Sequence, residues 1–249
     1  MRRLLPLLLL VAALATACGG SGGGTTRSEP PGSAPAASTA ADAPTADVFP
    51  AEGAERATVV LYHGWTDLTP DGYLPWIRHL TGTGVTVVFP RYQRSVLSLP
   101  GTMLADAEAA TRAGLVAAPP QGPVIAAGYS LGGGYAVVYA ANAAAWSAPQ
   151  PDAVYAVFPA MPPVVPDPFG AVPKATTVTM LAGDADQVVG TLGANQLAAA
   201  IAPHPATIDI LASTKAIAFD HFARKRTDTP AQKAFWAPLD RIVDRLAPR

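Results

Sequence analysis

The sequence contains a single cysteine, Cys18, among 249 residues. One cysteine excludes an intramolecular disulfide bond and a metal site built from several thiolates. An excess of charge is also missing, because 17 lysine and arginine residues oppose 18 aspartate and glutamate residues, so no basic surface for nucleic acid is indicated. Histidine is scarce, and no two of His63, His79, His204 and His221 have metal-ligand spacing. We therefore expect no metal, no cofactor and no nucleic-acid partner.

The hydrophobic run at the N-terminus is short for a membrane-spanning helix. A positive start at residues 1–3 precedes the mostly apolar residues 4–17, whereas a span needs about 20 apolar residues. This pattern is typical of an export signal peptide. The sequence Leu-Ala-Thr-Ala-Cys at residues 14–18 resembles the lipobox of bacterial lipoproteins, although Ala15 stands where many lipoboxes have leucine. The resemblance implies lipidation of Cys18; an ordinary cleaved signal with an incidental cysteine remains the alternative.

A segment of small and polar residues follows the signal. Residues 19–46 are mostly glycine, serine, threonine, alanine and proline, with few charges and no apolar period. Such a segment cannot bury a core, which predicts a flexible tether. We expect a signal peptide at 1–17, a lipid-anchored linker at 18–47 and a folded domain at 48–249, exported and held at the outer face of the cell membrane.

Apolar strands alternate with helices through the rest of the chain. We expect strands at 57–62, 85–89, 123–128, 153–158, 176–181 and 206–211, and helices at 71–82, 102–116 (capped by Thr102), 131–145, 193–202 and 231–246. This alternation predicts a mostly parallel sheet covered by helices on both faces. Residues 159–173 hold six prolines and no helical period, so we expect no cap domain there.

One serine lies between glycines where a predicted strand ends and a predicted helix begins. Gly128-Tyr129-Ser130-Leu131-Gly132 fits the pattern G-x-S-x-G in the strand–turn–helix context of a nucleophile elbow. The small Gly128 and Gly132 permit a sharp turn, and the helix dipole favours negative charge near Ser130. A tight turn without chemistry would need the same glycines.

With this motif, residues 55–249 resemble the α/β-hydrolase superfamily, and the Gly-Tyr-Ser sequence resembles its dienelactone-hydrolase-like members, which carry cysteine where this chain has Ser130. The resemblance implies the α/β-hydrolase fold and a triad in the order serine, acid, histidine. The segment after the strand at 176–181 resembles the family's G-x-x-D turn, which assigns the acid to Asp186 in preference to Asp184. His221, between the last strand and the last helix, has the place of the base.

The other histidines fit that place poorly. His63 lies in a loop that ends a strand, His79 on an amphipathic helix as a surface or packing residue, and His204 between two prolines, where we expect it to be solvated. By resemblance, the backbone N–H groups of Trp65 and Leu131 would bind an oxyanion. The loop at 90–93 could line the site, with no assigned role.

These residues predict a serine hydrolase that cleaves carboxylic esters of a small-molecule or acyl substrate through an acyl-enzyme. The same triad also supports thioester, amide and acyl-transfer chemistry. A non-catalytic binding lipoprotein with this fold is the alternative from another class. Without a cap, the site is expected to be open and bordered by Trp65, Tyr129 and the proline-rich segment.

Overall fold

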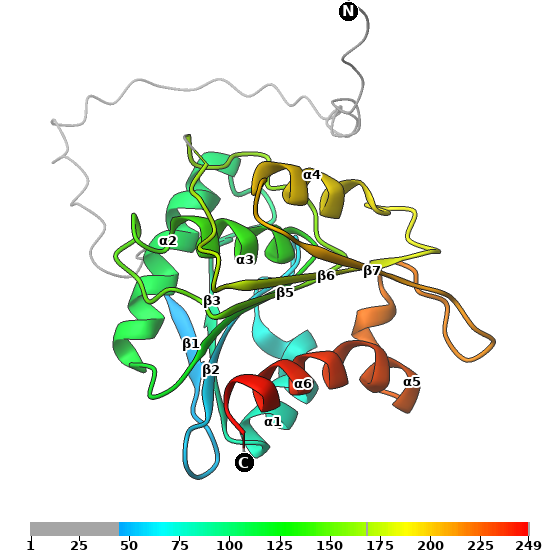
Figure 1. The fold of residues 1–249 in the computed structure, drawn as a ribbon, viewed down its shortest axis with the longest axis horizontal. Helices are drawn as coiled ribbons and strands as arrows, with labels where there is room; N and C mark the ends of the chain where they lie inside the picture. Colours follow the sequence, from blue (N-terminus) through cyan, green and yellow to red (C-terminus); the bar gives the residue numbers. More distant parts are fainter. Residues whose placement is uncertain (1–44, 168, 249) are drawn as a thin grey trace, which may run out of the picture. The chain divides into compact units, whose positions relative to one another are not determined.

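A seven-stranded sheet lies at the centre of the structure, a computed structural model that describes residues 45–167 and 169–248 (Figure 1). The strand order is β1-β3-β2-β4-β5-β6-β7. All neighbouring strands pair in parallel except β1, which is antiparallel to β3. The strands are β1 (Ala46–Phe49), β2 (Ala57–Tyr62), β3 (Val85–Pro90), β4 (Val124–Tyr129), β5 (Ala153–Val157), β6 (Thr177–Gly183) and β7 (Thr207–Leu211).

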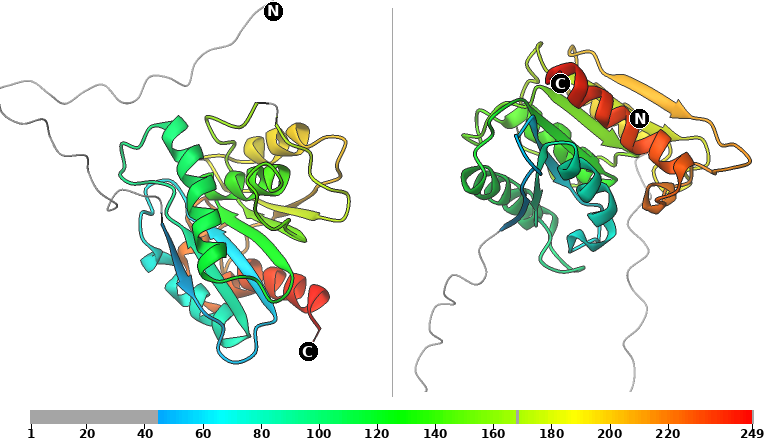
Figure 2. Two further views of the ribbon diagram at one scale, coloured as in Figure 1. Left: turned by 90° about the vertical axis from the view of Figure 1, so that its left-hand side faces the viewer. Right: turned by 90° about the horizontal axis from the view of Figure 1, so that it is seen from below.

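Helices cover both faces of this sheet. On one face lie α2 (Pro100–Ala117), α3 (Leu131–Asn142) and α4 (Leu192–Ala200), and on the other lie α1 (Leu74–Gly82) and α6 (Ala237–Leu246). Seen from below, α6 runs across the face of the sheet that it shares with α1 (Figure 2, right). Short helical turns complete the chain: η1 (Pro70–Tyr73), η2 (Ala223–Lys225), α5 (Thr229–Ala231) and the π-helical turn η3 (Gln232–Trp236).

The central strands are apolar along their whole length because each of their faces packs against helices. Every residue of β2, β3, β4 and β5 is buried. Along β2, Val59 and Leu61 join the core beneath α1 and α6, while Val60 and Tyr62 join the core beneath α2 and α3. This two-sided burial explains why the strands read as continuous apolar runs, as parallel sheets do.

The sheet order places β4 between the first and second halves of the sheet. The chain runs outward from β2 to β3 and then crosses back to β4, beside β2, before continuing to β5. At such a switch point the carboxyl ends of the strands leave room for a ligand site. The segment after β4, which contains Ser130, lies at this position.

The structure differs from expectation at the edge strand β1 and at the start of α2. The strand β1 was not expected, and its pairing places Ala46 opposite Pro90 at the end of β3. The helix α2 starts at Pro100, and its N-cap is Leu99, three residues before the expected cap Thr102. Proline suits the first helical position, since its fixed φ matches the helix and its missing N–H would have no partner there.

The described part of the segment between β5 and β6 forms no cap domain over the sheet. Residues 159–167 and 169–176 contain no helix and no strand. Within the described ranges, no helix has the length and apolar character needed to cross a membrane. The predicted signal peptide, Cys18 and most of the predicted linker lie outside the residues that the structure describes.

Candidate active site

Ser130 occupies a strained turn between β4 and α3. Its φ of 54° and ψ of −124° lie in a region that L-residues rarely adopt. A Cβ on Gly128 would lie 2.2 Å from the carbonyl oxygen of Gly132, and one on Gly132 would lie 2.3 Å from the carbonyl oxygen of His63. The turn therefore excludes side chains at both glycines, as the G-x-S-x-G pattern predicts.

The structure brings three predicted side chains into one hydrogen-bonded row. Ser130 Oγ lies 2.9 Å from His221 Nε2, and His221 Nδ1 lies 2.8 Å from Asp186 Oδ2. All three residues are buried, with relative exposures of 8%, 6% and 5% for Ser130, His221 and Asp186. They come from segments after β4, β7 and β6, which all end at the same edge of the sheet.

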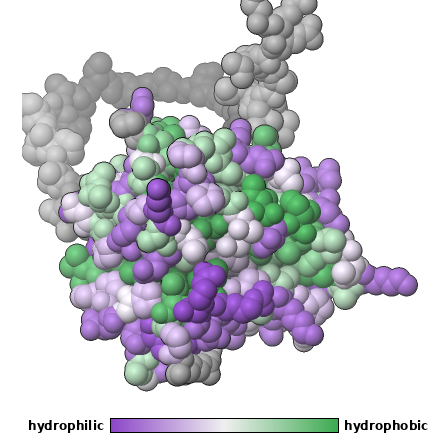
Figure 3. All heavy atoms as spheres, viewed as in Figure 1, coloured by the Kyte–Doolittle hydropathy of each residue, from purple (hydrophilic) through white to green (hydrophobic). Residues whose placement is uncertain are grey.

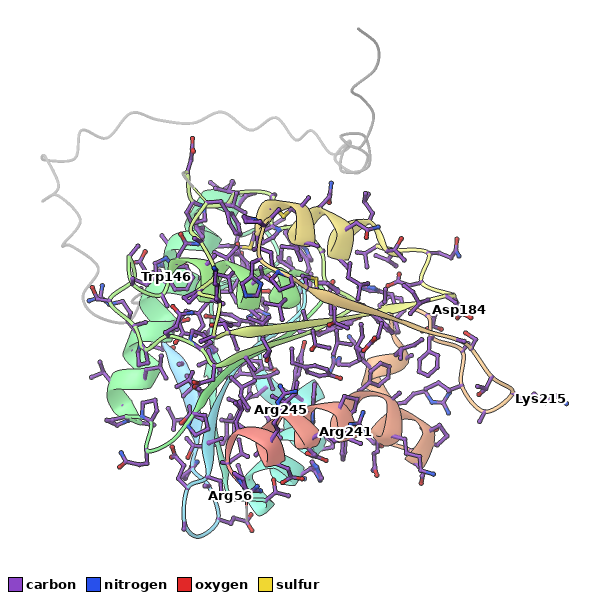
Figure 4. All side chains as sticks on the ribbon, in the orientation of Figure 1. Arg56, Trp146, Asp184, Lys215, Arg241 and Arg245 are labelled. Carbon is purple, nitrogen blue, oxygen red and sulfur yellow. The ribbon has the colours of Figure 1, made fainter. Side chains whose placement is uncertain are left out.

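The two candidate aspartates have different partners. The Oδ1 atom of Asp186 accepts hydrogen bonds from the N–H groups of Val188 and Val189, at 2.8 and 3.0 Å, which leaves Oδ2 facing His221. Asp184 is exposed and accepts from the hydroxyl and N–H of Ser213, and these hydrogen bonds lower the pKa of its carboxyl group. Asp184 lies at the outer end of β6, as Figure 4 shows.

Tyr129 contacts His221 through both its hydroxyl group and its ring. Its hydroxyl donates to the carbonyl oxygen of His221 at 2.7 Å, and the two rings are 5.1 Å apart. Burial raises the pKa of Tyr129, so this donor stays protonated near neutral pH. Tyr129 is only 3% exposed, and the expectation that it borders the opening of the site is therefore wrong. Its hydrogen bond instead fixes the main chain of His221 in the segment after β7.

Two backbone N–H groups are candidates for an oxyanion site. Within the described residues, the N–H groups of Leu131 and Trp65 have no hydrogen-bond acceptor. Leu131 begins α3, directly after Ser130, and Trp65 lies in the loop after β2. The Trp65 side chain is 45% exposed, so it is not a core aromatic.

Two residues of the loop at 90–93 contact the segment after β2 from within the core. Gln93 is 2% exposed, and its Oε1 accepts from the N–H of Thr66 at 2.9 Å. Tyr92 stacks on the His63 ring with centroids 4.1 Å apart, and its hydroxyl donates to the His63 carbonyl oxygen. Sequence reasoning missed these contacts because the partners are 27 and 29 residues apart with no pattern connecting them.

The remaining histidines have structural contacts. His79 Nε2 lies 2.9 Å from both carboxylate oxygens of Asp240, which fits the predicted packing role. His204 is half-buried, with Nε2 at 2.9 Å from the carbonyl oxygen of Thr176, so the prediction of a solvated ring is wrong. This contact joins the turn after α4 to the residue just before β6. Among the described residues, no three potential metal ligands form a group.

Comparison with known proteins identifies the fold. No family model and no curated protein matches this sequence. Esterase 2 of the Planctomycetes species Thermogutta terrifontis, with butyrate bound, superposes with a TM-score of 0.58 at 19% identity over 82% of this chain and 91% of the other. The same esterase phosphoramylated by tabun gives 0.60 at 18% identity, over 82% and 91% of the two chains. Its form phosphorylated by paraoxon gives 0.59 at 18%, over 82% and 90%. Together with the parallel sheet, these likenesses show that the chain has the α/β-hydrolase fold.

Proposed function

We propose that this protein is a serine hydrolase that cleaves carboxylic esters, with Ser130 as nucleophile, His221 as base and Asp186 as the acid that orients it. The row of hydrogen bonds from Ser130 through His221 to Asp186 carries the proposal. The strained backbone of Ser130 adds support, because strain of this kind persists where the surrounding structure enforces it, and such sites are often functional.

The proposed chemistry proceeds through an acyl-enzyme. Ser130 Oγ attacks the ester carbonyl carbon while its proton passes to His221 Nε2. The tetrahedral intermediate then expels the alcohol, which receives that proton. A water molecule then attacks the acyl carbonyl carbon and passes a proton to His221 Nε2. Collapse of this second tetrahedral intermediate breaks the bond to Ser130 Oγ, which takes the proton back from His221 as the carboxylic acid leaves. Asp186 accepts a hydrogen bond from His221 Nδ1–H throughout and stabilises the imidazolium.

The negative charge of the tetrahedral intermediate would be stabilised by the N–H groups of Leu131 and Trp65. Backbone donors fixed before the reaction cost no reorganisation when charge develops. The N-terminal end of α3 adds a favourable dipole at Ser130. The Thermogutta esterase, which has this fold, is described with butyrate bound and with organophosphate adducts, and an ester-cleaving activity at the same position in this chain is consistent with that.

We further propose that the chain is exported and anchored to the cell membrane through lipid on Cys18. The support is the order of a positive start, a short apolar run and small residues before the chain's single cysteine. Mass spectrometry of the mature N-terminus tests this proposal. A lipidated Cys18 as first residue supports it, and an unmodified cysteine or another cleavage site overturns it.

Replacement of triad residues tests the catalytic proposal. Ser130→Ala and His221→Ala are each expected to lower kcat for p-nitrophenyl esters by about 10³-fold or more, with the fold retained by circular dichroism. A fluorophosphonate probe should label the wild type and fail to label Ser130→Ala. The exposed Ser147→Ala and the packing His79→Ala serve as controls and should keep activity within about tenfold of wild type. Activity within tenfold of wild type in either triad variant contradicts the mechanism, and an unlabelled wild type favours the binding-protein alternative.

A further inference from the structure

The loop after β2 presents three consecutive backbone N–H groups near Ser130. The N–H of Gly64 donates to the Tyr73 hydroxyl at 2.7 Å, and the N–H of Thr66 donates to Gln93 Oε1 at 2.9 Å. The N–H of Trp65, between them, has no acceptor within the described residues. Side chains from two separate elements therefore bind the flanking donors and leave the central donor available.

Tyr73, at the end of η1, holds the Gly64 side of the loop. Its side chain is fully buried, and its hydroxyl proton is donated to Asp67 Oδ2 at 3.1 Å. The oxygen of that hydroxyl is thus left to accept from Gly64. The Arg224 guanidinium lies 4.0 Å from the centre of the Tyr73 ring and 3.5 Å from Asp67 Oδ2. This arrangement fixes the tyrosine through a cation–π contact and an ion pair.

Gln93, after β3, holds the Thr66 side. Thr66 has a φ of 68°, in the left-handed region, where a β-branched residue is strained. Such a conformation persists only when its surroundings enforce it. The Gln93 amide is 2% exposed, and its hydrogen bond to the Thr66 N–H is a contact that enforces it.

We propose that Tyr73 and Gln93 are positioning residues for the oxyanion site, which hold the Trp65 N–H toward the carbonyl of a substrate bound at Ser130. This inference rests on the proposed esterase function. The two hydrogen bonds fix the peptide units on both sides of Trp65, so the donor is oriented before negative charge develops. Neither side chain touches the substrate; each acts through the backbone of the loop.

Tyr73→Phe and Gln93→Met test the two contacts separately, since each keeps the side chain's size and removes the hydrogen-bonding oxygen. Loss of an oxyanion donor costs about 10²- to 10³-fold in kcat, and a loosened donor is expected to cost roughly tenfold or more. The KM should stay within about threefold, because the ground-state carbonyl needs the donor less than the transition state does. Tyr155→Phe is the matched control, as it removes another fully buried hydroxyl that donates to a backbone carbonyl, that of Phe235.

A thiono ester distinguishes positioning of the oxyanion donor from general loss of structure. Sulfur accepts hydrogen bonds weakly, so the wild type should prefer an ester over the matching thiono ester. In both positioning variants this ratio of kcat/KM values should fall toward one, and in Tyr155→Phe it should equal that of the wild type. Equal losses on both substrates, or an unchanged ratio, would overturn the proposal.

Amide hydrogen exchange tests the same contacts without any reaction. Exchange at the Gly64 N–H should be faster in Tyr73→Phe than in the wild type, and exchange at the Thr66 N–H should be faster in Gln93→Met, with both unchanged in Tyr155→Phe. Faster exchange in a protein that cleaves no ester would refute the proposed function and leave the loop contacts standing. Unchanged exchange beside normal esterase activity would refute the positioning role alone. Unfolding of both variants would show that the contacts serve the fold, which also overturns the proposal.

Discussion

Two aspartates that are two residues apart in the chain have different environments. The buried Asp186 faces the His221 ring, while the exposed Asp184 binds Ser213. Only a carboxylate in contact with the imidazole can fix its tautomer and stabilise its charged form. Because the residues share a turn, replacing each by asparagine separates the effect of position from that of charge.

Asp186→Asn is expected to lower kcat by about 10³-fold or more, and Asp184→Asn should leave kcat within about tenfold of the wild type. Steady-state hydrolysis of p-nitrophenyl butyrate measures both variants. Asp184→Asn is the matched control for the loss of a charge in this turn. If Asp184→Asn proved the more damaging change, the assignment of the acid would be reversed.

The His63 ring is fully buried at the end of β2. Burial lowers its pKa to about 4, against the opposing effect of its hydrogen bond with the Gly64 carbonyl and of nearby Asp67; Arg91 also lowers it. The folded protein thus favours the neutral ring. The stability from this preference is complete above pH 6.5, the unfolded value, and is lost as the pH falls toward 4. A shift of this size corresponds to roughly 3 kcal/mol.

We therefore expect His63→Gln to have a flatter stability profile than the wild type between pH 6.5 and pH 4. Urea unfolding at a series of pH values measures the free energy of unfolding directly. Parallel profiles for His63→Gln and the wild type would count against a neutral buried ring.

At the scale of elements, the strands of the central sheet were predictable from their apolar runs. The strand β2 has the bounds predicted for it, and β3 ends one residue later than predicted. The strand β1 was missed because its four residues are half-buried and pair antiparallel at the edge of the sheet, which leaves no apolar run to recognise. Sequence signals thus identify strands that are buried on both faces better than edge strands.

The last helix was expected as one regular element at 231–246. The structure instead has α5, the π-helical turn η3 and then α6, with Pro238 in the first turn of α6. Proline has no N–H and its ring crowds the carbonyl four residues earlier, so a continuous α-helix is disfavoured there. Widened turns are a known response to such an interruption. The apolar period indicated the helix and could not indicate this local irregularity.

The candidate site was predictable to the extent that its residues follow strands. Ser130, Asp186 and His221 each come after a parallel strand, and such strand ends meet at one edge. The contacts of Tyr73 with Gly64 and of Gln93 with Thr66 were not predictable. They join segments with no common motif, and only the folded backbone brings an acceptor to each N–H.

At the scale of the whole molecule, apolar side chains surround the edge of the sheet where Ser130 lies. Figure 3 shows hydrophobic residues gathered on the right of this face, over the edge strand β7. Several exposed large apolar residues belong to segments that follow the carboxyl ends of strands: Trp65, Val96, Leu97, Val164, Val188 and Phe222. An apolar surround favours acyl groups over charged ones.

The missing cap predicts preference for short acyl chains. The described residues between β5 and β6 form no helix that could enclose a long chain, so p-nitrophenyl butyrate should be cleaved with a higher kcat/KM than the palmitate. No lid has to move, and the rate should pass smoothly through the solubility limit of a short ester. A marked preference for palmitate, or an abrupt rise at that limit, would contradict this expectation.

The antiparallel edge strand makes the two ends of the domain unequal. Thr45 accepts a hydrogen bond from the N–H of Arg91, just past the carboxyl end of β3, so the chain enters on the side of Ser130. The chain leaves on the opposite side, where Arg56, before β2, binds the carbonyl of Ala247 (Figure 4). Any support joined through the N-terminal side is therefore attached beside the mouth of the site, and one joined through the C-terminal side is attached behind it. The direction of β1 therefore decides which side of the domain, the side of Ser130 or the opposite one, lies next to a support attached at either end.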